Sequence, residues 1–234
     1  TALITRAVTK GLNPDAPMKN SGIEWLGEIP AHWEVAPIKR DKELLTSGSR
    51  GWATHYSDDG DLFLRIANLT RDSIRLNLLN IQHVMAPDGA EAERSKVQEG
   101  DVLFSITAYL GSVAVVPQGI GKAYVSQHLA LFRLMQKLFL PDWIALCAIS
   151  DVGKDYLASR GYGGTKIQLS LDDVDQFIVP VPSIDEQKQI LSFIGDEQGK
   201  ILGSKEKIEK VIHRLEEYRS ALITNAVTGQ IKVA

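Results

Sequence analysis

Residues 178–194, IVPVPSIDEQKQILSFI, mark the point at which the sequence changes from a strand-like pattern to a helical one. Pro180 and Pro182 end the preceding apolar segment. Ser183 is followed three residues later by Glu186, which is the spacing of a helix capping box. The sequence therefore predicts that a helix begins at Ser183.

Apolar residues recur downstream of this start at intervals of seven, and two more occupy intermediate positions of the same seam. Charged residues fill most of the remaining positions. A helix from residue 183 to about residue 226 would be about 66 Å long at 1.5 Å per residue, too long to pack only on its own domain. We expect a coiled-coil-type helix that needs a partner helix. Its pairing seam is Ile194, Ile201, Ile208, Val211, Leu215, Tyr218 and Leu222.

Upstream, residues 38–180 alternate short β-branched and aromatic runs with turn signals, which is typical of a strand-rich, curled sheet. Residues 141–161 predict a helix with Pro141 in its first turn and Gly161 at its end. Ser170 and Asp173 have capping-box spacing, so the nearby aspartates are interpreted as helix N-terminal anions rather than a metal cluster. The predicted fold class is α+β: a strand-rich curled-sheet domain with small helices, followed by one long helix.

The two ends of the sequence carry nearly the same phrase. Residues 1–12 read TALITRAVTKGL and residues 220–231 read SALITNAVTGQI, with seven of the twelve aligned positions identical. The second copy closes the long helix at Gly229, so the first should be the end of an equivalent helix, as in one unit cut from a longer array. The expected organisation is the end of a central helix at 1–12, an irregular linker at 13–37, a recognition domain at 38–182, and a long distal helix with a tail at 183–234.

Composition narrows the possible functions. The net charge is −3, and residues 37–180 hold fifteen lysines and arginines against seventeen acids, so binding through bulk positive charge is disfavoured. No membrane segment or secretory signal is visible. The single cysteine, Cys147, lies in an apolar run and cannot form an internal disulfide, which fits a reducing cytoplasm.

Several segments together identify a family. NPDAPMKNSGIEWLGEIPAHWEV at 13–35, GDVLFSITAYLGSVAVV at 100–116 and GGTKIQLSLDDVDQFIVPVPSIDEQKQI at 163–190, followed by a long helix that ends ALITNAVTGQI, resemble the specificity subunit of type I restriction-modification systems. In that family two target-recognition domains are separated by two long antiparallel helices, and each domain reads half of a split DNA site. This chain resembles the second half, because the first recognition domain has no counterpart in it.

The resemblance implies that partners perform the chemistry: modification subunits that methylate adenine with S-adenosylmethionine, and a motor-nuclease subunit that uses ATP. The sequence itself has no phosphate-binding GxxxxGK[ST] motif and no NPP[YF] segment, and its five histidines lack metal-ligand spacing. We therefore expect no enzymatic activity, no cofactor and no metal in this chain.

Direct reading of DNA requires forked donors and amides on exposed loops, with hydroxyls and cations on phosphates. Three stretches meet this requirement. Residues 65–75 could equally be an ordinary strand edge, and His128 in the second stretch could equally be a core histidine. The third stretch, 158–170, is glycine-rich and is interpreted as a DNA-contacting loop rather than a simple turn. The candidates are Arg65, Asn68, Thr70, Arg71 and Arg75; Ser126, Gln127 and His128; and Arg160, Tyr162, Gly163, Gly164, Thr165 and Lys166.

Lys96, Ser105, Thr107 and Tyr109 flank the segment 100–111 and are secondary candidates, with Tyr109 more typical of a core residue. The leading hypothesis is a non-catalytic module that binds double-stranded DNA and docks modification subunits. One alternative is a half-size subunit, two copies of which pair through the helices to read a symmetric split site. Another is an assembly scaffold whose loops do not read DNA. A helix of about 66 Å would also act as a spacer between half-sites.

Overall fold

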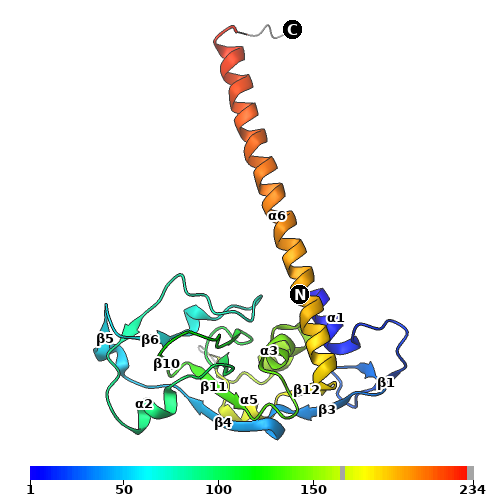
Figure 1. Cartoon of the computed structure of the whole chain (residues 1–234), viewed down its shortest axis with the longest axis vertical. Coiled ribbons are helices and arrows are strands. Elements are labelled where there is room, and N and C mark those ends of the chain that lie inside the picture. Colours follow the sequence, from blue (N-terminus) through cyan, green and yellow to red (C-terminus); the bar gives the residue numbers. More distant parts are fainter. Residues whose placement is uncertain (164–166, 231–234) are drawn as a thin grey trace. The chain divides into compact units, whose positions relative to one another are not determined.

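The computed structural model describes residues 1–163 and 167–230. It contains two compact units, residues 1–191 and residues from 192 onward. The first unit holds all the β-strands, and the second consists of the greater part of one long helix (Figure 1). The predicted α+β class, with a strand-rich body and a long helix, is confirmed.

The principal sheet is antiparallel, with strand order β4-β11-β8-β9. Its strands are β4 (Lys42–Ser47), β11 (Leu129–Leu134), β8 (Val102–Ser105) and β9 (Val113–Val115). β8 and β9 are buried along their whole length and β11 at all but one residue. Near-continuous β-branched and aliphatic runs are expected for strands covered on both faces. The sheet therefore forms the centre of the hydrophobic core.

A second sheet has the order β10-β6-β7-β5. It consists of β10 (Ala123–Val125), β6 (Asp61–Leu64), β7 (His83–Val84) and β5 (Tyr56–Ser57). β10 pairs with β6 in parallel, and the other pairs are antiparallel. Because β10 leads directly into β11, the turn between them connects the two sheets.

Short helices cover the sheets: α2 (Ala90–Ser95), α3 (Pro141–Ile149), α4 (Asp151–Ser159), α5 (Leu171–Asp175), and the 3-10 turns η1 (Ile38–Asp41), η2 (Trp52–His55) and η3 (Ile66–Asn68). The single helix predicted for 141–161 is wrong, because Ser150 breaks it into α3 and α4. Ser150 adopts an extended conformation, and its side chain accepts a hydrogen bond from the Gly153 N–H as the N-cap of α4. The capping box of α5 is confirmed.

The segment 13–37 is more regular than an irregular linker. It contains a hairpin of β1 (Met18–Asn20) with β2 (Glu28–Pro30), followed by β3 (Glu34–Pro37), which pairs with β12 (Ile178–Val181). Trp33 is fully buried edge-on against Trp143, with ring centroids 6.0 Å apart. The segment therefore belongs to the packed body.

Helix α1 (Ala2–Lys10) contacts β2, α3 and α4 through Ile4, Ala7 and Val8, which are all buried. Thr5 Oγ1 donates a hydrogen bond to Asp151 Oδ2 at 3.0 Å and accepts one from the Asp151 N–H at 2.9 Å. We call the surface that receives α1 the α1 seat. The first copy of the repeated phrase is thus packed into the first unit.

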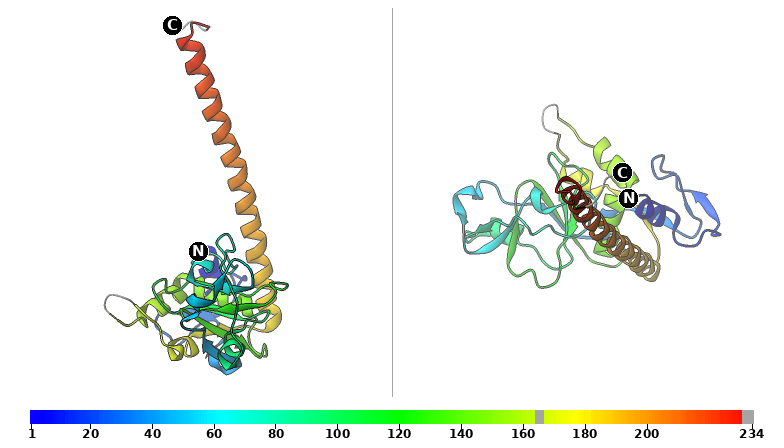
Figure 2. Two further views of the ribbon diagram at one scale, coloured as in Figure 1. Left: turned by 90° about the vertical axis from the view of Figure 1, so that its left-hand side faces the viewer. Right: turned by 90° about the horizontal axis from the view of Figure 1, so that it is seen from above.

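Helix α6 (Ile184–Val227) is continuous over 44 residues, in agreement with the predicted long helix (Figure 2). The Ser183 side chain caps it by accepting from the Glu186 N–H at 3.2 Å, while the Glu186 carboxylate pairs with His32 instead of completing the capping box. Of the predicted seam, Ile194 is buried and is not available to a partner helix. The other six side chains, Ile201, Ile208, Val211, Leu215, Tyr218 and Leu222, are between 40% and 64% exposed.

Candidate nucleic-acid interface

The turn at 126–128, between β10 and β11, is fixed by the backbone of neighbouring segments. The Ser126 N–H donates to the Leu64 carbonyl at 2.9 Å, and the Gln127 N–H donates to the Ser49 carbonyl at 3.0 Å. Because these bonds join backbone atoms only, substitutions of the side chains in the turn need not change its path. A rigid backbone of this kind suits a site that must hold polar groups in register.

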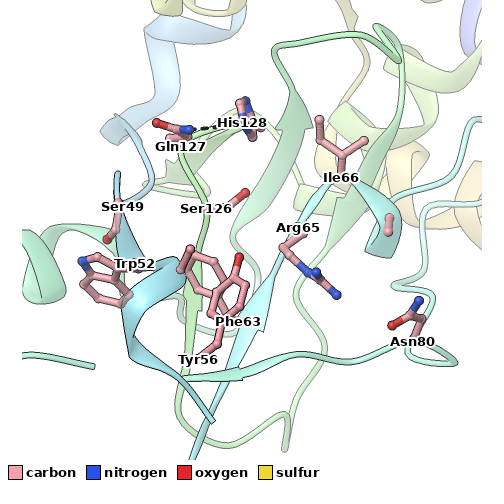
Figure 3. A pocket seen from close by; sticks show the side chains of 13 residues that line it. Ser49, Trp52, Tyr56, Phe63, Arg65, Ile66, Asn80, Ser126, Gln127 and His128 are labelled. Carbon is pink, nitrogen blue, oxygen red and sulfur yellow. Dashed lines mark hydrogen bonds between the residues drawn. The ribbon is translucent and has the colours of Figure 1, made fainter. Parts of the chain in front are cut away.

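A pocket of about 410 Å³ opens beside this turn (Figure 3). Aromatic rings form one wall: Trp52 stacks on Phe63 with centroids 5.8 Å apart, and Tyr56 lies against Phe63 at 5.7 Å. Polar side chains complete the lining. Figure 3 shows Arg65 and Asn80 on the side away from Trp52, and Gln127 and His128 above, with 3.3 Å between Gln127 Nε2 and His128 Nε2.

Two polar atoms in this pocket are buried without a hydrogen-bond partner among the described residues. They are Ser126 Oγ and Arg65 Nε. Buried polar groups are nearly always paired, because an unpaired group costs its full desolvation energy. Both residues line the pocket, so a polar group that enters it can pair with them.

A loop at 106–112 joins two of the predicted stretches through its backbone. The Ile106 N–H donates to the His128 carbonyl at 3.0 Å, and the Ile106 carbonyl accepts from the Leu169 N–H at 2.9 Å. Ala108, which has the unusual φ of 65°, donates its N–H to the Ile167 carbonyl at 3.2 Å. The turn at 126–128 and the glycine-rich stretch are therefore connected by one loop.

The same loop reaches the stretch at 65–75. Tyr109 lines a second hollow of about 500 Å³ together with Thr70 and Arg71. Ile66 and Ala67 line both this hollow and the pocket. The interpretation of Tyr109 as a core residue is wrong, because its side chain is 64% exposed. The stretches at 65–75 and 126–128, far apart in sequence, thus line one connected surface, and the backbone of the 106–112 loop joins the third stretch to it. We call this surface the recognition face.

Two described residues of the glycine-rich stretch form an isolated antiparallel bridge. Tyr162 and Gln168 exchange two backbone hydrogen bonds, at 2.9 and 2.8 Å, and Gly163 has a φ of 104°. Tyr162 is exposed, and the Arg160 guanidinium lies over the Tyr156 ring at 5.3 Å. The predicted candidates Gly164, Thr165 and Lys166 lie outside the described residues.

Asn68 has a structural role that removes it from the set of base-reading candidates. It is fully buried, its Oδ1 accepts from the Arg65 N–H at 2.9 Å, and its Nδ2 donates to the carbonyls of Asn77 and Asn80 at 2.9 and 3.1 Å. These bonds use both ends of the carboxamide, so none remains for a base. Asn68 instead holds the loop that carries Asn80.

Two cations lie elsewhere. Arg75 pairs with Asp142 at 3.7 Å and lines a separate polar groove. Lys96 is exposed beyond α2, its backbone pairs with Tyr124, and it does not line the pocket. Thr70 lines the second hollow, but its hydroxyl is engaged by the backbone of Ser73. The secondary candidates Ser105 and Thr107 are buried.

Sequence reasoning missed the aromatic wall and Asn80. Trp52 lies in the turn η2, whereas Tyr56 and Phe63 lie in β5 and β6, two strands that meet only through β7, so no local pattern brings the three rings together. The only signal was the presence of three aromatic residues within twelve positions of a segment also rich in glycine and aspartate.

Two buried groups of the first unit have shifted pKa values. Burial raises the pKa of the Tyr156 hydroxyl, which donates to the Gln176 carbonyl at 3.0 Å. Burial also raises the pKa of Asp101, although Arg133 opposes the shift through hydrogen bonds at 2.7 and 2.8 Å. Both side chains are held by partners inside the body, and neither lines the pocket or the second hollow.

Within residues 1–163 and 167–230, no group of three or more histidine, cysteine, aspartate or glutamate side chains is arranged to hold a metal ion. None of the helices in that part of the chain combines the length and the apolar character needed to span a membrane.

Comparison with known proteins places the chain in a family. Residues 88–213 match the family model described as the type I restriction modification DNA specificity domain. The chain is 20% identical over 173 residues to the EcoBI specificity subunit of Escherichia coli, covering 74% of this chain and 36% of that protein. It is 23% identical over 216 residues to the EcoKI specificity subunit of Escherichia coli K12, covering 88% of this chain and 44% of that one. The chain thus spans less than half the length of these relatives.

Solved structures share the fold. A chain from a study of complex assembly and conformational transition in the type I restriction-modification system aligns with a TM-score of 0.66 at 17% identity, covering 92% of this chain and 48% of that one. The HsdS subunit of Thermoanaerobacter tengcongensis aligns with a TM-score of 0.58 at 16% identity, covering 86% and 42%. Because the family model covers more than half of the sequence, this chain belongs to the type I restriction modification DNA specificity domain family.

Proposed function

We propose that this chain is a non-catalytic DNA-recognition module that reads one half of a split site in double-stranded DNA. The observation that supports this most strongly is the recognition face, where the stretches at 65–75 and 126–128 line two adjoining hollows with donors and aromatic rings. Backbone hydrogen bonds of the loop at 106–112 join the glycine-rich stretch to them. Such groups, presented from a rigid backbone, are what reading of base edges requires.

The long helix provides the surfaces through which the module contacts its partners. Six exposed apolar side chains on α6 form a seam that a second helix can cover, and the helix also offers a docking surface to modification subunits. S-adenosylmethionine and ATP belong, in this proposal, to the modification subunits and to a motor-nuclease subunit that binds indirectly. A free, buried Cys147 suits the reducing cytoplasm in which such a complex works.

The repeated phrase supports a specific kind of pairing. In the first copy Ile4, Ala7 and Val8 are buried in the α1 seat, whereas the equivalent Ile223 and Val227 of the second copy are exposed. The seat on this domain is already filled by α1. The second copy therefore fits an empty seat of the same kind on another recognition domain.

A second candidate is a half-size subunit that pairs with a copy of itself through the exposed seam of α6. The filled seat opposes closure of such a pair, because each copy would lack a place for the other's second phrase. Sedimentation velocity across a concentration series separates the two candidates. A monomer alone supports a module that works beside a different recognition domain, and a pair at micromolar concentration supports the half-size subunit.

The proposed function is tested by selecting bound duplexes from a random DNA pool, with the chain assembled on a modification subunit. Arg65→Ala together with Arg71→Ala removes two cations of the recognition face. The matched control is Arg75→Ala, since Arg75 lies in a separate groove and pairs with Asp142. We expect enrichment of one half-site motif by the wild type and by the control, and its loss in the double variant.

Other outcomes decide between readings. Two symmetric half-sites would establish the paired half-size subunit. A motif that survives the double variant but not the control would locate the reading surface at the other groove. If no motif is enriched with the partner present, DNA recognition by this chain is refuted and the assembly scaffold takes its place.

A further inference from the structure

One exposed residue stands next to the pocket with no structural explanation. Leu79 is 95% exposed, the highest value among the large apolar side chains of the described residues. It directly precedes Asn80, which lines the pocket. A leucine exposed to this degree buries almost no surface, so its side chain contributes almost nothing to the stability of the fold.

The loop that presents Leu79 is anchored. The Leu79 N–H donates to the Asn77 side chain at 3.1 Å, and the Asn68 carboxamide holds the carbonyls of both Asn77 and Asn80. The Asn77 N–H in turn donates to the Asn68 carbonyl at 2.9 Å. Leu79 is therefore held out from the surface on a braced loop.

The adjoining pocket has the composition of a site for a flat heteroaromatic ring. Its apolar wall includes the ring of Tyr56, which is exposed, backed by the stacked Trp52 and Phe63. The opposite side presents Arg65 and Asn80, and Ser126 Oγ lies buried and unpaired in the lining. A volume of about 410 Å³ falls within the range of pockets that enclose small ligands.

An apolar wedge beside such a pocket matches the requirements of base extrusion. Apolar side chains that enter a duplex unstack a base step, and enzymes that take a base out of the helix hold it by ring contacts and by hydrogen bonds to its edge. We propose that Leu79 enters the duplex at one step of the half-site and that the pocket receives the unstacked nucleobase. This inference rests on the proposed DNA-binding function and extends it.

Leu79 and the pocket residues have different roles in this proposal. Leu79 takes the place of the departed base in the stack, and Tyr56 offers the face on which that base lies. Ser126 Oγ and Arg65 Nε gain the hydrogen-bond partners that they lack in the free protein. The energy recovered at these two atoms offsets part of the unstacking cost.

The test uses the complete chain and a duplex that it selects, at low ionic strength and without modification subunits, so that no methyltransferase contributes an extruded adenine. Fluorescence anisotropy of an end label measures occupancy. At the same occupancy, 2-aminopurine or pyrrolocytosine is placed at successive positions of both strands, and a rise in its emission reports unstacking. We expect a several-fold rise at one position with the wild type.

Two variants test the proposal, and a third is their control. Leu79→Ala should reduce the rise at that position by more than half. Ser126→Ala should weaken binding by about fivefold to tenfold while leaving the thermal midpoint equal or higher. Leu12→Ala, another exposed leucine outside the recognition face, should match the wild type in both measurements.

Failures of the two proposals are distinguishable. If anisotropy never saturates, the chain does not bind DNA by itself and base extrusion by its own residues is refuted, while the DNA-binding function is decided separately by the selection with the modification subunit. If binding saturates but no position brightens, or if Leu79→Ala leaves the rise unchanged, base extrusion is refuted while DNA binding stands. If Leu79→Ala weakens assembly with the modification subunit and leaves the DNA signal intact, Leu79 is a protein contact and the inference is overturned.

Discussion

The two copies of the repeated phrase allow one substitution to be made in two environments. Val8 is 1% exposed in the α1 seat, and its counterpart Val227 near the end of α6 is 82% exposed. Val8→Ala removes two buried carbons, worth about 1.6 kcal/mol in transfer free energy, and the cavity that it leaves raises the expected loss to about 2–3 kcal/mol. Val227→Ala removes carbons already in water and adds a better helix former, so the free energy of unfolding should not fall.

The measurement is urea unfolding of both variants beside the wild type, followed by tryptophan fluorescence. Trp33 is buried beside the α1 seat, where the C-terminal end of α1 meets it at Gly11, so its emission should respond when the seat opens. With a slope of about 2–3 kcal/mol/M, Val8→Ala should lower the midpoint by about 1 M and Val227→Ala by less than about 0.2 M. Equal losses for the two variants, or no loss for Val8→Ala, would refute the assignment of the α1 seat.

Three further outcomes are expected. Asp41→Asn should lower the free energy of unfolding by about 2–4 kcal/mol in the same urea assay. The buried carboxylate accepts three backbone N–H bonds at 2.9 to 3.0 Å, and an amide must turn its NH₂ toward one of these donors. A loss below about 1 kcal/mol would contradict this. Burial raises the pKa of the Cys147 thiol well above its usual range, so the native chain should resist thiol-specific labelling at pH 8 to 9 while the urea-unfolded chain reacts at once; stability from this group should also fall as pH rises above the unfolded value of about 8.5, since the unfolded state loses the proton first. Asn68→Ala should reduce DNA binding even though Asn68 is buried, because the loop at 77–80 loses the hydrogen bonds that brace it. Hydrogen exchange should then show less protection of this loop, and unchanged exchange there would exclude the bracing role.

Local signals in the sequence were sufficient for the long helix and the class of fold. The capping serine at 183 and the seven-residue spacing required no knowledge of the rest of the chain, and the structure has the helix where they predict it. The same reasoning failed at Ser150, because a serine inside an apolar run is compatible with a continuous helix until packing forces it into an extended conformation. Ile194 belongs to the heptad pattern by spacing alone, and its burial could not be read from that spacing.

The recognition face shows a different limit. Each of the three stretches was recognisable by its polar and glycine-rich composition, but their meeting depends on backbone bonds made by the loop at 106–112, which no periodicity marks. Asn68 and Arg75 had the right chemistry for reading bases and lie in the wrong places, one buried and one in another groove. Side-chain type predicts what a residue can do, whereas only the fold decides whether it is exposed to do it.

The backbone hydrogen bonds that fix the turn at 126–128 and the loop at 106–112 affect how the domain can evolve. They are made by N–H and carbonyl groups of Ile106, Ser126 and Gln127, which every amino acid except proline supplies in full. Mutations can therefore replace the side chains of the recognition face while the loops keep their paths. On the proposed function, a domain of this kind can change the DNA sequence that it recognises in small steps, each leaving a folded protein, and these loops are the place to introduce a new specificity.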